Sequence, residues 1–132
     1  MAPRSPADAL PGRSRQGGLR MAVEWPEPGV VLVRLAGDVD LAAVPVVTEL
    51  MRQRLTAASL RVVVVDLSGV AFCSTAGVEL LLHAQRRSDM RGIELMVVTG
   101  DGPVRRVLEL SGVAERFVCP DSAVEALARA RG

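Results

Sequence analysis

Two adjacent hydroxyl residues, Ser74 and Thr75, stand where an apolar segment gives way to a helical pattern. The run Leu60–Leu67 is rich in Val and typical of a buried central strand, and Val78–His83 has helical character. Hydroxyls at such a junction lie beside unpaired backbone N–H groups and the positive end of the helix dipole. Two roles fit there: an N-cap that accepts a backbone N–H, which the pattern alone favours, or an acceptor for a phosphoryl group.

Two aspartates, Asp38 and Asp40, follow another apolar strand, Val30–Leu35. Because the carboxyl ends of parallel strands meet at one edge of a sheet, we expect these aspartates to share an edge with Ser74 and Thr75. A turn or a helix N-cap would also use Asp. Both interpretations stay open for Asp40, whereas a turn explains Asp38 better.

Glu79, His83 and Arg87 recur at one-turn intervals and predict one outer helix face. A solvated face is the usual explanation, and a partner-binding face beside the hydroxyls is compatible with it. A Ser–His hydrolase fits poorly, because the chain has no G-x-S-x-G elbow and the helical spacing points His83 away from Ser74. With two cysteines, one histidine and no Walker loop, we expect no metal site, no cofactor and no enzymatic activity.

The two cysteines, Cys73 and Cys119, allow a redox role to be considered. Cys73 would neighbour a helix N-terminus, which lowers a thiol pKa. One strand is expected between the strands that carry them, so their separation would be about 10 Å, beyond the limit of about 7 Å for a disulfide. Cys73 is therefore better interpreted as a small buried hydrophobic residue.

The surrounding segments predict an α/β fold. Residues 1–18 are rich in Pro, Gly, Ser and Arg, so we expect a flexible leader without a fold of its own, followed by one domain over 19–132. An N-terminal antiparallel edge strand over Leu19–Trp25 and a turn at Pro26–Gly29 should precede a mainly parallel sheet. The remaining expected elements are strands at 30–35, 60–67, 93–98 and 116–119, and helices at 43–57, 76–88, 103–111 and 122–129.

Composition narrows the class of protein. A chain of 132 residues with 49% hydrophobic content is long enough for one domain with a core. The balance of 16 basic and 15 acidic residues, with one Trp, two Phe and no Tyr, argues against nucleic-acid binding. No apolar segment reaches the about 20 residues of a membrane span, and the N-terminus lacks a signal-peptide core. We therefore expect a soluble cytoplasmic protein with no membrane partner.

Two stretches resemble the anti-sigma factor antagonists, the bacterial single-domain members of the STAS family. Asp66–Gly77 reads DLSGVAFCSTAG, where the family pattern is close to D-L-S-x-V-x-F-(M/L)-D-S-(S/T)-G. Leu35–Asp40 reads LAGDVD, where the family has a G-E-(I/L)-D loop. The resemblance extends from Leu19 to Arg129, with further matches at Gly92–Leu95, Pro103–Arg106 and Leu110–Val113.

This resemblance implies a fold of β-α units wound as a superhelix, and it implies a function. Such a protein binds an anti-sigma factor of the histidine-kinase-like ATPase type, which then frees its sigma factor. Phosphorylation of the antagonist by that ATPase ends the binding. On this sequence the phosphoacceptor falls on Thr75, with Ser74 as the second choice, and Asp40 falls on the loop aspartate. Asp38, Ser74, Thr75, Glu79 and His83 would complete the partner-binding surface.

The sequence departs from the family pattern on both sides of the acceptor. Ser74 replaces the family's Asp, and Ala76 follows Thr75. The loss of that Asp removes one negative charge from the docking surface and a carboxylate able to orient the acceptor hydroxyl. Two other functions stay open: a non-switching STAS subunit of a lipid-transport or stress-signalling assembly, and a thiol-responsive regulator built on Cys73.

Overall fold

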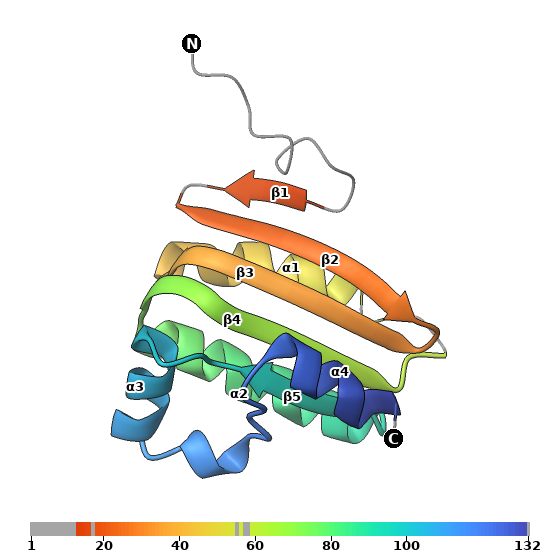
Figure 1. Ribbon diagram of the computed structural model, residues 1–132. Coiled ribbons are helices and arrows are strands. Elements are labelled where there is room, and N and C mark those ends of the chain that lie inside the picture. The colour runs from red at the N-terminus through yellow and green to blue at the C-terminus, as the bar shows by residue number, and fades with distance from the viewer. Residues whose placement is uncertain (1–12, 17, 55, 57–58, 132) are drawn as a thin grey trace.

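The computed structural model describes residues 13–16, 18–54, 56 and 59–131, and in them a sheet with helices on both faces (Figure 1). The sheet has five strands in the order β1-β2-β3-β4-β5. The strands are β1 (Arg13–Gln16), β2 (Leu19–Glu27), β3 (Val30–Val39), β4 (Val62–Cys73) and β5 (Glu94–Val98). The helical segments are η2 (Leu41–Ala43), α1 (Val44–Arg54), α2 (Thr75–Met90), α3 (Pro103–Leu110), η3 (Ala114–Arg116) and α4 (Ala123–Arg131).

The sheet is mixed, which confirms the expected α/β class. β1 pairs with β2 and β2 with β3 in antiparallel fashion, whereas β3, β4 and β5 are parallel. The strand that starts at Leu19 is not the edge strand that the sequence predicted, because β1 pairs outside it. β1 lies within the segment expected to be a leader without a fold, so the sheet begins before the expected boundary at Leu19; residues 1–12 lie outside the described part.

β4 forms the centre of the molecule and separates two apolar clusters. Val63 and Val65 pack into the larger cluster, together with side chains of α1, α2 and α3. Val62 and Val64 point to the other face and pack with Ala126 and Ala130 of α4. Helices on opposite faces of the sheet thus explain why the run of valines is continuous rather than alternating with polar residues (Figure 1).

The predicted ends of two strands are wrong, and the last predicted strand is nearly absent. β3 continues to Val39 instead of ending near Leu35, so Asp38 lies in a strand and not in the expected turn. β4 continues to Cys73 instead of ending near Leu67. The pairing of β3 with β4 accommodates the turn-like residues through register shifts between Arg34 and Ala36 and between Gly37 and Asp38. The strand expected at 116–119 is reduced to one bridge between Val118 and Met96. None of the described helices is long and apolar enough to cross a membrane.

The final helix begins as the sequence predicted. Glu125 N–H donates to Ser122 Oγ at 3.1 Å, and the carboxylate of Glu125 accepts the backbone N–H of Asp121 at 2.9 Å. This reciprocal capping fixes the start of α4, whose small residues then lie flat on the sheet.

Candidate functional site

The ends of β3 and β4 bring the two predicted site segments together. Val39 and Cys73 are register partners, and the backbone N–H of Ser74 donates to the carbonyl oxygen of Val39 at 2.9 Å. Asp40 and Thr75 are the next residue along each of these two segments. The structure therefore places both of them at one edge of the sheet, as expected for the carboxyl ends of parallel strands.

Of the two hydroxyl residues, Thr75 is the more exposed. It is the first residue of α2 and is exposed. Ser74 is the N-cap residue, but its hydroxyl makes no capping bond, and Ser74 Oγ is buried without a hydrogen-bond partner among the described residues. The N-cap interpretation thus holds for the backbone position of Ser74 and not for its side chain.

Gly77 holds the start of α2 against the strand ends. A Cβ built at Gly77 would lie 2.8 Å from Cys73 Sγ and 3.0 Å from Val39 Cγ1. Both distances are shorter than normal carbon contacts, so only glycine lets the first turn of the helix sit this close to β3 and β4. The position of Thr75, two residues earlier, depends on this close packing.

The two aspartates differ in their surroundings. Asp40 Oδ1 accepts the backbone N–H of Ala43 at 3.0 Å, which makes Asp40 the N-cap of η2. Asp38 is exposed at the end of β3, opposite Phe72 in the register, and its backbone N–H donates to Gly18 O at 3.2 Å. Asp40 therefore has the structural role that the sequence left open, and it lies at the same edge of the sheet as Thr75.

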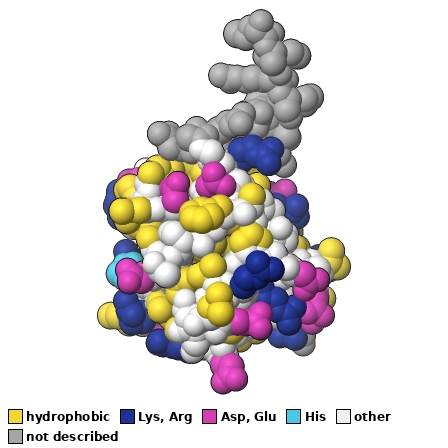
Figure 2. All heavy atoms as spheres, turned by 90° about the vertical axis from the view of Figure 1, so that its left-hand side faces the viewer, with side chains coloured by type: hydrophobic (Ala, Val, Ile, Leu, Met, Phe, Trp, Pro, Cys, Tyr) yellow, Lys and Arg dark blue, Asp and Glu magenta, His cyan; other side chains and the backbone are white. Residues whose placement is uncertain are grey.

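Exposed apolar side chains accompany these charges, and sequence reasoning missed them. Leu41 is 76% exposed and Phe72 is 51% exposed, and they neighbour Asp40 and Asp38 respectively. Figure 2 views the molecule from this side and shows hydrophobic side chains interspersed with acidic ones. No signal in the sequence marks either residue, because Leu and Phe are among the residues most often buried. Leu41, Phe72, Asp40 and Thr75 are hereafter called the edge surface.

The outer residues of α2 continue away from the edge surface. Glu79, His83 and Arg87 are all exposed, as their one-turn spacing predicted. His83 and Arg87 also border a narrow groove between α1 and α2. The face is solvated, and the structure leaves it open to a partner.

The cysteines do not form a reactive pair. Cys73 is buried and Cys119 is exposed, and both are free thiols. Burial raises the pKa of the Cys73 thiol, so the lowering expected from the helix N-terminus is wrong. Burial also raises the pKa of Cys119, with Arg105 opposing the effect. The packing of Cys73 in the larger cluster agrees with its interpretation as a small hydrophobic residue.

Metal-binding chemistry finds no support in the described ranges. No group of three or more His, Cys, Asp or Glu side chains there is arranged to hold a metal ion. The edge surface offers one carboxylate, one hydroxyl and apolar area, a combination that is common at interfaces between proteins.

Comparison with known proteins gives matches over most of the chain. A family model for the STAS domain matches residues 26–126. An anti-sigma F factor antagonist from Paenibacillus polymyxa is 27% identical over 99 residues, which are 75% of this chain and 85% of that protein.

Two solved structures share the fold. An anti-sigma factor antagonist from Mycobacterium paratuberculosis aligns with a TM-score of 0.76 and 24% identity, over 86% of this chain and 95% of that chain. The anti-sigma factor antagonist SpoIIAA in its unphosphorylated form aligns with a TM-score of 0.69 and 23% identity, over 85% and 96% of the two chains. At these identities the likeness concerns the fold.

Proposed function

We propose that this chain, which belongs to the STAS domain family, is an anti-sigma factor antagonist that binds its partner through the edge surface. The observation that carries the proposal is the exposed Thr75 at the same sheet edge as Asp40, both on segments that resemble the antagonist motifs. The curated relative from Paenibacillus polymyxa carries the same function in its name. The partner is an anti-sigma factor of the histidine-kinase-like ATPase type, and its binding frees a sigma factor.

The physical basis of docking is a small apolar centre with charges around it. Leu41 and Phe72 expose apolar area that a partner would remove from water, and Asp38 and Asp40 lie next to them. Interfaces of ordinary size bury about 800 Å² on each partner, which is enough to cover the edge surface and the first turns of α2. A partner with a basic side chain near an apolar pocket would match it.

Phosphorylation of Thr75 would reverse the docking without unfolding the domain. A phosphate adds about −1.5 to −2 charges, and the N-terminus of α2 stabilises them through its dipole and free N–H groups. The first turn of α2 contains no acidic residue that would already occupy that position. The same charge next to Asp40 and Asp38 would change the field that the partner meets, and it would need to be desolvated on binding.

The experiment is incubation of the full chain with an ATPase-type anti-sigma factor and ATP, followed by mass spectrometry of peptides covering Ser74 and Thr75. One phosphate on Thr75 is expected, because Ser74 Oγ is buried. Thr75→Ala should abolish the mass shift, and Ser74→Ala should leave it in place. A phosphate on Ser74, or none on either residue, would contradict the proposed switch.

A further inference from the structure

A second surface lies between α1 and α2, next to the edge surface but separate from it. Its floor is apolar and is formed by Met51, Leu80, Ala84 and Ile93. The hollow measures about 50 Å³. Binding sites for small molecules have volumes of about 300–1,000 Å³, so this groove is too small for one. It has room for the end of one aliphatic side chain.

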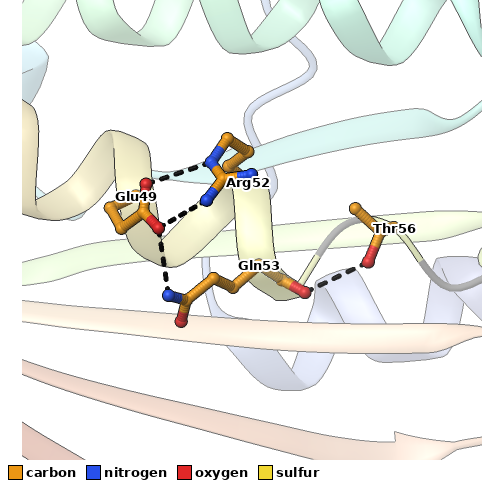
Figure 3. A network of polar contacts seen from close by, with 4 residues as sticks. All are labelled: Glu49, Arg52, Gln53 and Thr56. Carbon is orange, nitrogen blue, oxygen red and sulfur yellow. Dashed lines mark hydrogen bonds and ion pairs between the residues drawn. The ribbon is translucent and has the colours of Figure 1, made fainter.

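The rim of the groove is basic. Arg52 on α1 and His83, Arg87 and Arg91 on or just after α2 line it, and all four are exposed. Arg52 Nε and Nη2 already donate to the Glu49 carboxylate, at 3.0 and 2.6 Å. Gln53 donates to the same carboxylate (Figure 3). Arg87 and Arg91 form no ion pair with any other residue in the described ranges. The charge available to a ligand is therefore on the α2 side.

We propose that this groove binds an acidic segment of the protein partner, in which carboxylates flank one aliphatic side chain. The aliphatic side chain would enter the apolar floor, and the carboxylates would pair with Arg87 and Arg91. Charge complementarity selects this occupant, because a basic segment would bring like charges together at the rim. The groove would thus bind the partner by an apolar anchor with charges around it, the usual arrangement of an interface hot spot.

One partner can reach both surfaces, and to this extent the inference rests on the proposed function. Thr75 and His83 are eight residues apart on the same helix, a distance of about 12 Å along its axis. An interface of about 800 Å² per side spans more than this. The anti-sigma factor would therefore contact the edge surface with one part and the groove with an acidic segment.

The test uses the full chain, labelled with ¹⁵N, and three synthetic ten-residue peptides. The first has one Leu between runs of Asp and Glu, the second replaces that Leu by Ser, and the third replaces the acidic residues by Lys. Amide shifts are followed by NMR during titration. Arg87→Glu is the test variant, and Arg86→Glu is the matched control, because Arg86 is exposed on the same helix but does not line the groove.

The expected result is saturable shifts at Met51, Ala84 and Arg87 with the acidic Leu peptide. Affinity should fall about tenfold in Arg87→Glu, as for loss of one ion pair and gain of one repulsion, and should stay unchanged in Arg86→Glu. No shifts at millimolar peptide, equal binding of the Lys or Ser peptide, or equal losses in the two variants would overturn the proposal. Sedimentation showing a dimer that Arg87→Glu disrupts would also overturn it, by assigning the groove to a second copy.

The groove proposal and the proposed docking at the edge surface can be contradicted independently of each other. The peptide titration contains no anti-sigma factor, and Thr75→Glu should bind the acidic peptide as the wild type does. Loss of anti-sigma binding in that variant would therefore leave the groove result intact. Conversely, a groove that ignores every peptide would leave docking at the edge surface untouched.

Discussion

The backbone N–H of Ser74 lies 2.9 Å from the carbonyl oxygen of Val39 and donates to it. This bond extends the pairing of β3 and β4 to the start of the segments that carry Asp40 and Thr75, although Ser74 lies 35 residues after Val39 in the chain. It makes the edge surface one continuous patch rather than two loops that meet by chance. A surface held by backbone groups keeps its shape when its side chains are changed, so it can be probed by substitution.

Gly77 should tolerate alanine poorly. Alanine in place of glycine favours a helix by about 1 kcal/mol, but overpacking of a tight contact costs about 1–3 kcal/mol. With Cys73 Sγ 2.8 Å from the new Cβ, the second effect should win, and urea denaturation of Gly77→Ala should show a loss of about 1–2 kcal/mol.

Two further variants make this measurement specific. Gly102→Ala is the control, because no atom lies within 4 Å of a Cβ at that position. Cys73→Ala combined with Gly77→Ala should recover part of the loss, since the closest contact is then removed. Strictly additive losses in the double variant would show that the contact with Cys73 is not the cause.

The hydroxyl of Ser74 should contribute nothing to stability. Replacing an N-cap side chain by Ala usually costs about 0.5–2 kcal/mol because a hydrogen bond is lost. Ser74 Oγ has no such bond, so Ser74→Ala should change the free energy of unfolding by less than about 0.5 kcal/mol. Asp40→Ala removes an observed bond to Ala43 and should cost about 1 kcal/mol. Thermal denaturation of both variants checks this, and a larger loss for Ser74→Ala than for Asp40→Ala would contradict it.

Sequence reasoning predicted that the segments carrying Asp40 and Thr75 would meet at one edge of the sheet because the signals are local. The valines of β4 predicted a strand buried on both faces, and the hydroxyls that follow predicted a helix start. The end of β4 was missed, because Ser68 and Gly69 are turn residues. In the structure Asp66 Oδ1 accepts both the N–H and the hydroxyl of Ser68, at 3.0 and 2.7 Å, inside a strand that continues. Ser68 and Gly69 could form a turn or continue the strand. Only the pairing with β3, which depends on distant residues, decides between these two conformations.

Other features could not be predicted from a sequence pattern, because they also depend on residues that are distant in the chain. Which of the two hydroxyls, that of Ser74 or that of Thr75, is exposed depends on how α2 packs against Val39. No sequence pattern predicts that contact. The pKa of Cys73 depends on a balance between the helix N-terminus and burial, and burial prevails. The groove between α1 and α2 requires the relative placement of two helices.

Stability should fall in alkaline solution through Cys73. Because burial raises the pKa of this thiol in the folded protein, the folded state holds its proton more tightly than the unfolded chain does. The free energy of unfolding should then decrease as pH rises above about 8.5, where a free thiol ionises, and through the folded pKa. The slope between pH 8 and 10 should be smaller in Cys73→Ala than in the wild type. An unchanged slope would assign the alkaline loss to other groups, with Cys119→Ala as the companion variant.

The apolar residues of the edge surface should matter for binding and little for folding. Leu41→Ser and Phe72→Ser remove exposed side chains, so the melting temperature should change little. Their affinity for an ATPase-type anti-sigma factor should fall about tenfold or more, as at interface hot spots. Val124→Ser is the matched control, because Val124 is 79% exposed on α4, across the sheet. Equal affinities for all three variants would exclude an apolar centre.

A negative charge at position 75 should be enough to weaken binding of the partner, without phosphorylation. Thr75→Glu places a carboxylate at the helix N-terminus and should weaken the anti-sigma complex, whereas Thr75→Ala should retain it. Pull-down of the partner by each variant, at low and at 0.5 M salt, gives the measurement. Retention of the complex by Thr75→Glu at both salt concentrations would remove the charge switch while leaving the docking surface in place.

The central claim is that the edge surface is where the partner binds, and a steric substitution tests it most directly. Isothermal titration of an ATPase-type anti-sigma factor into the wild type, Thr75→Ala and Thr75→Trp gives three affinities. We predict that Thr75→Ala stays within about threefold of the wild type and that Thr75→Trp loses at least about a hundredfold, because an indole at this exposed position separates the two surfaces. Wild-type affinity in a folded Thr75→Trp would contradict the account.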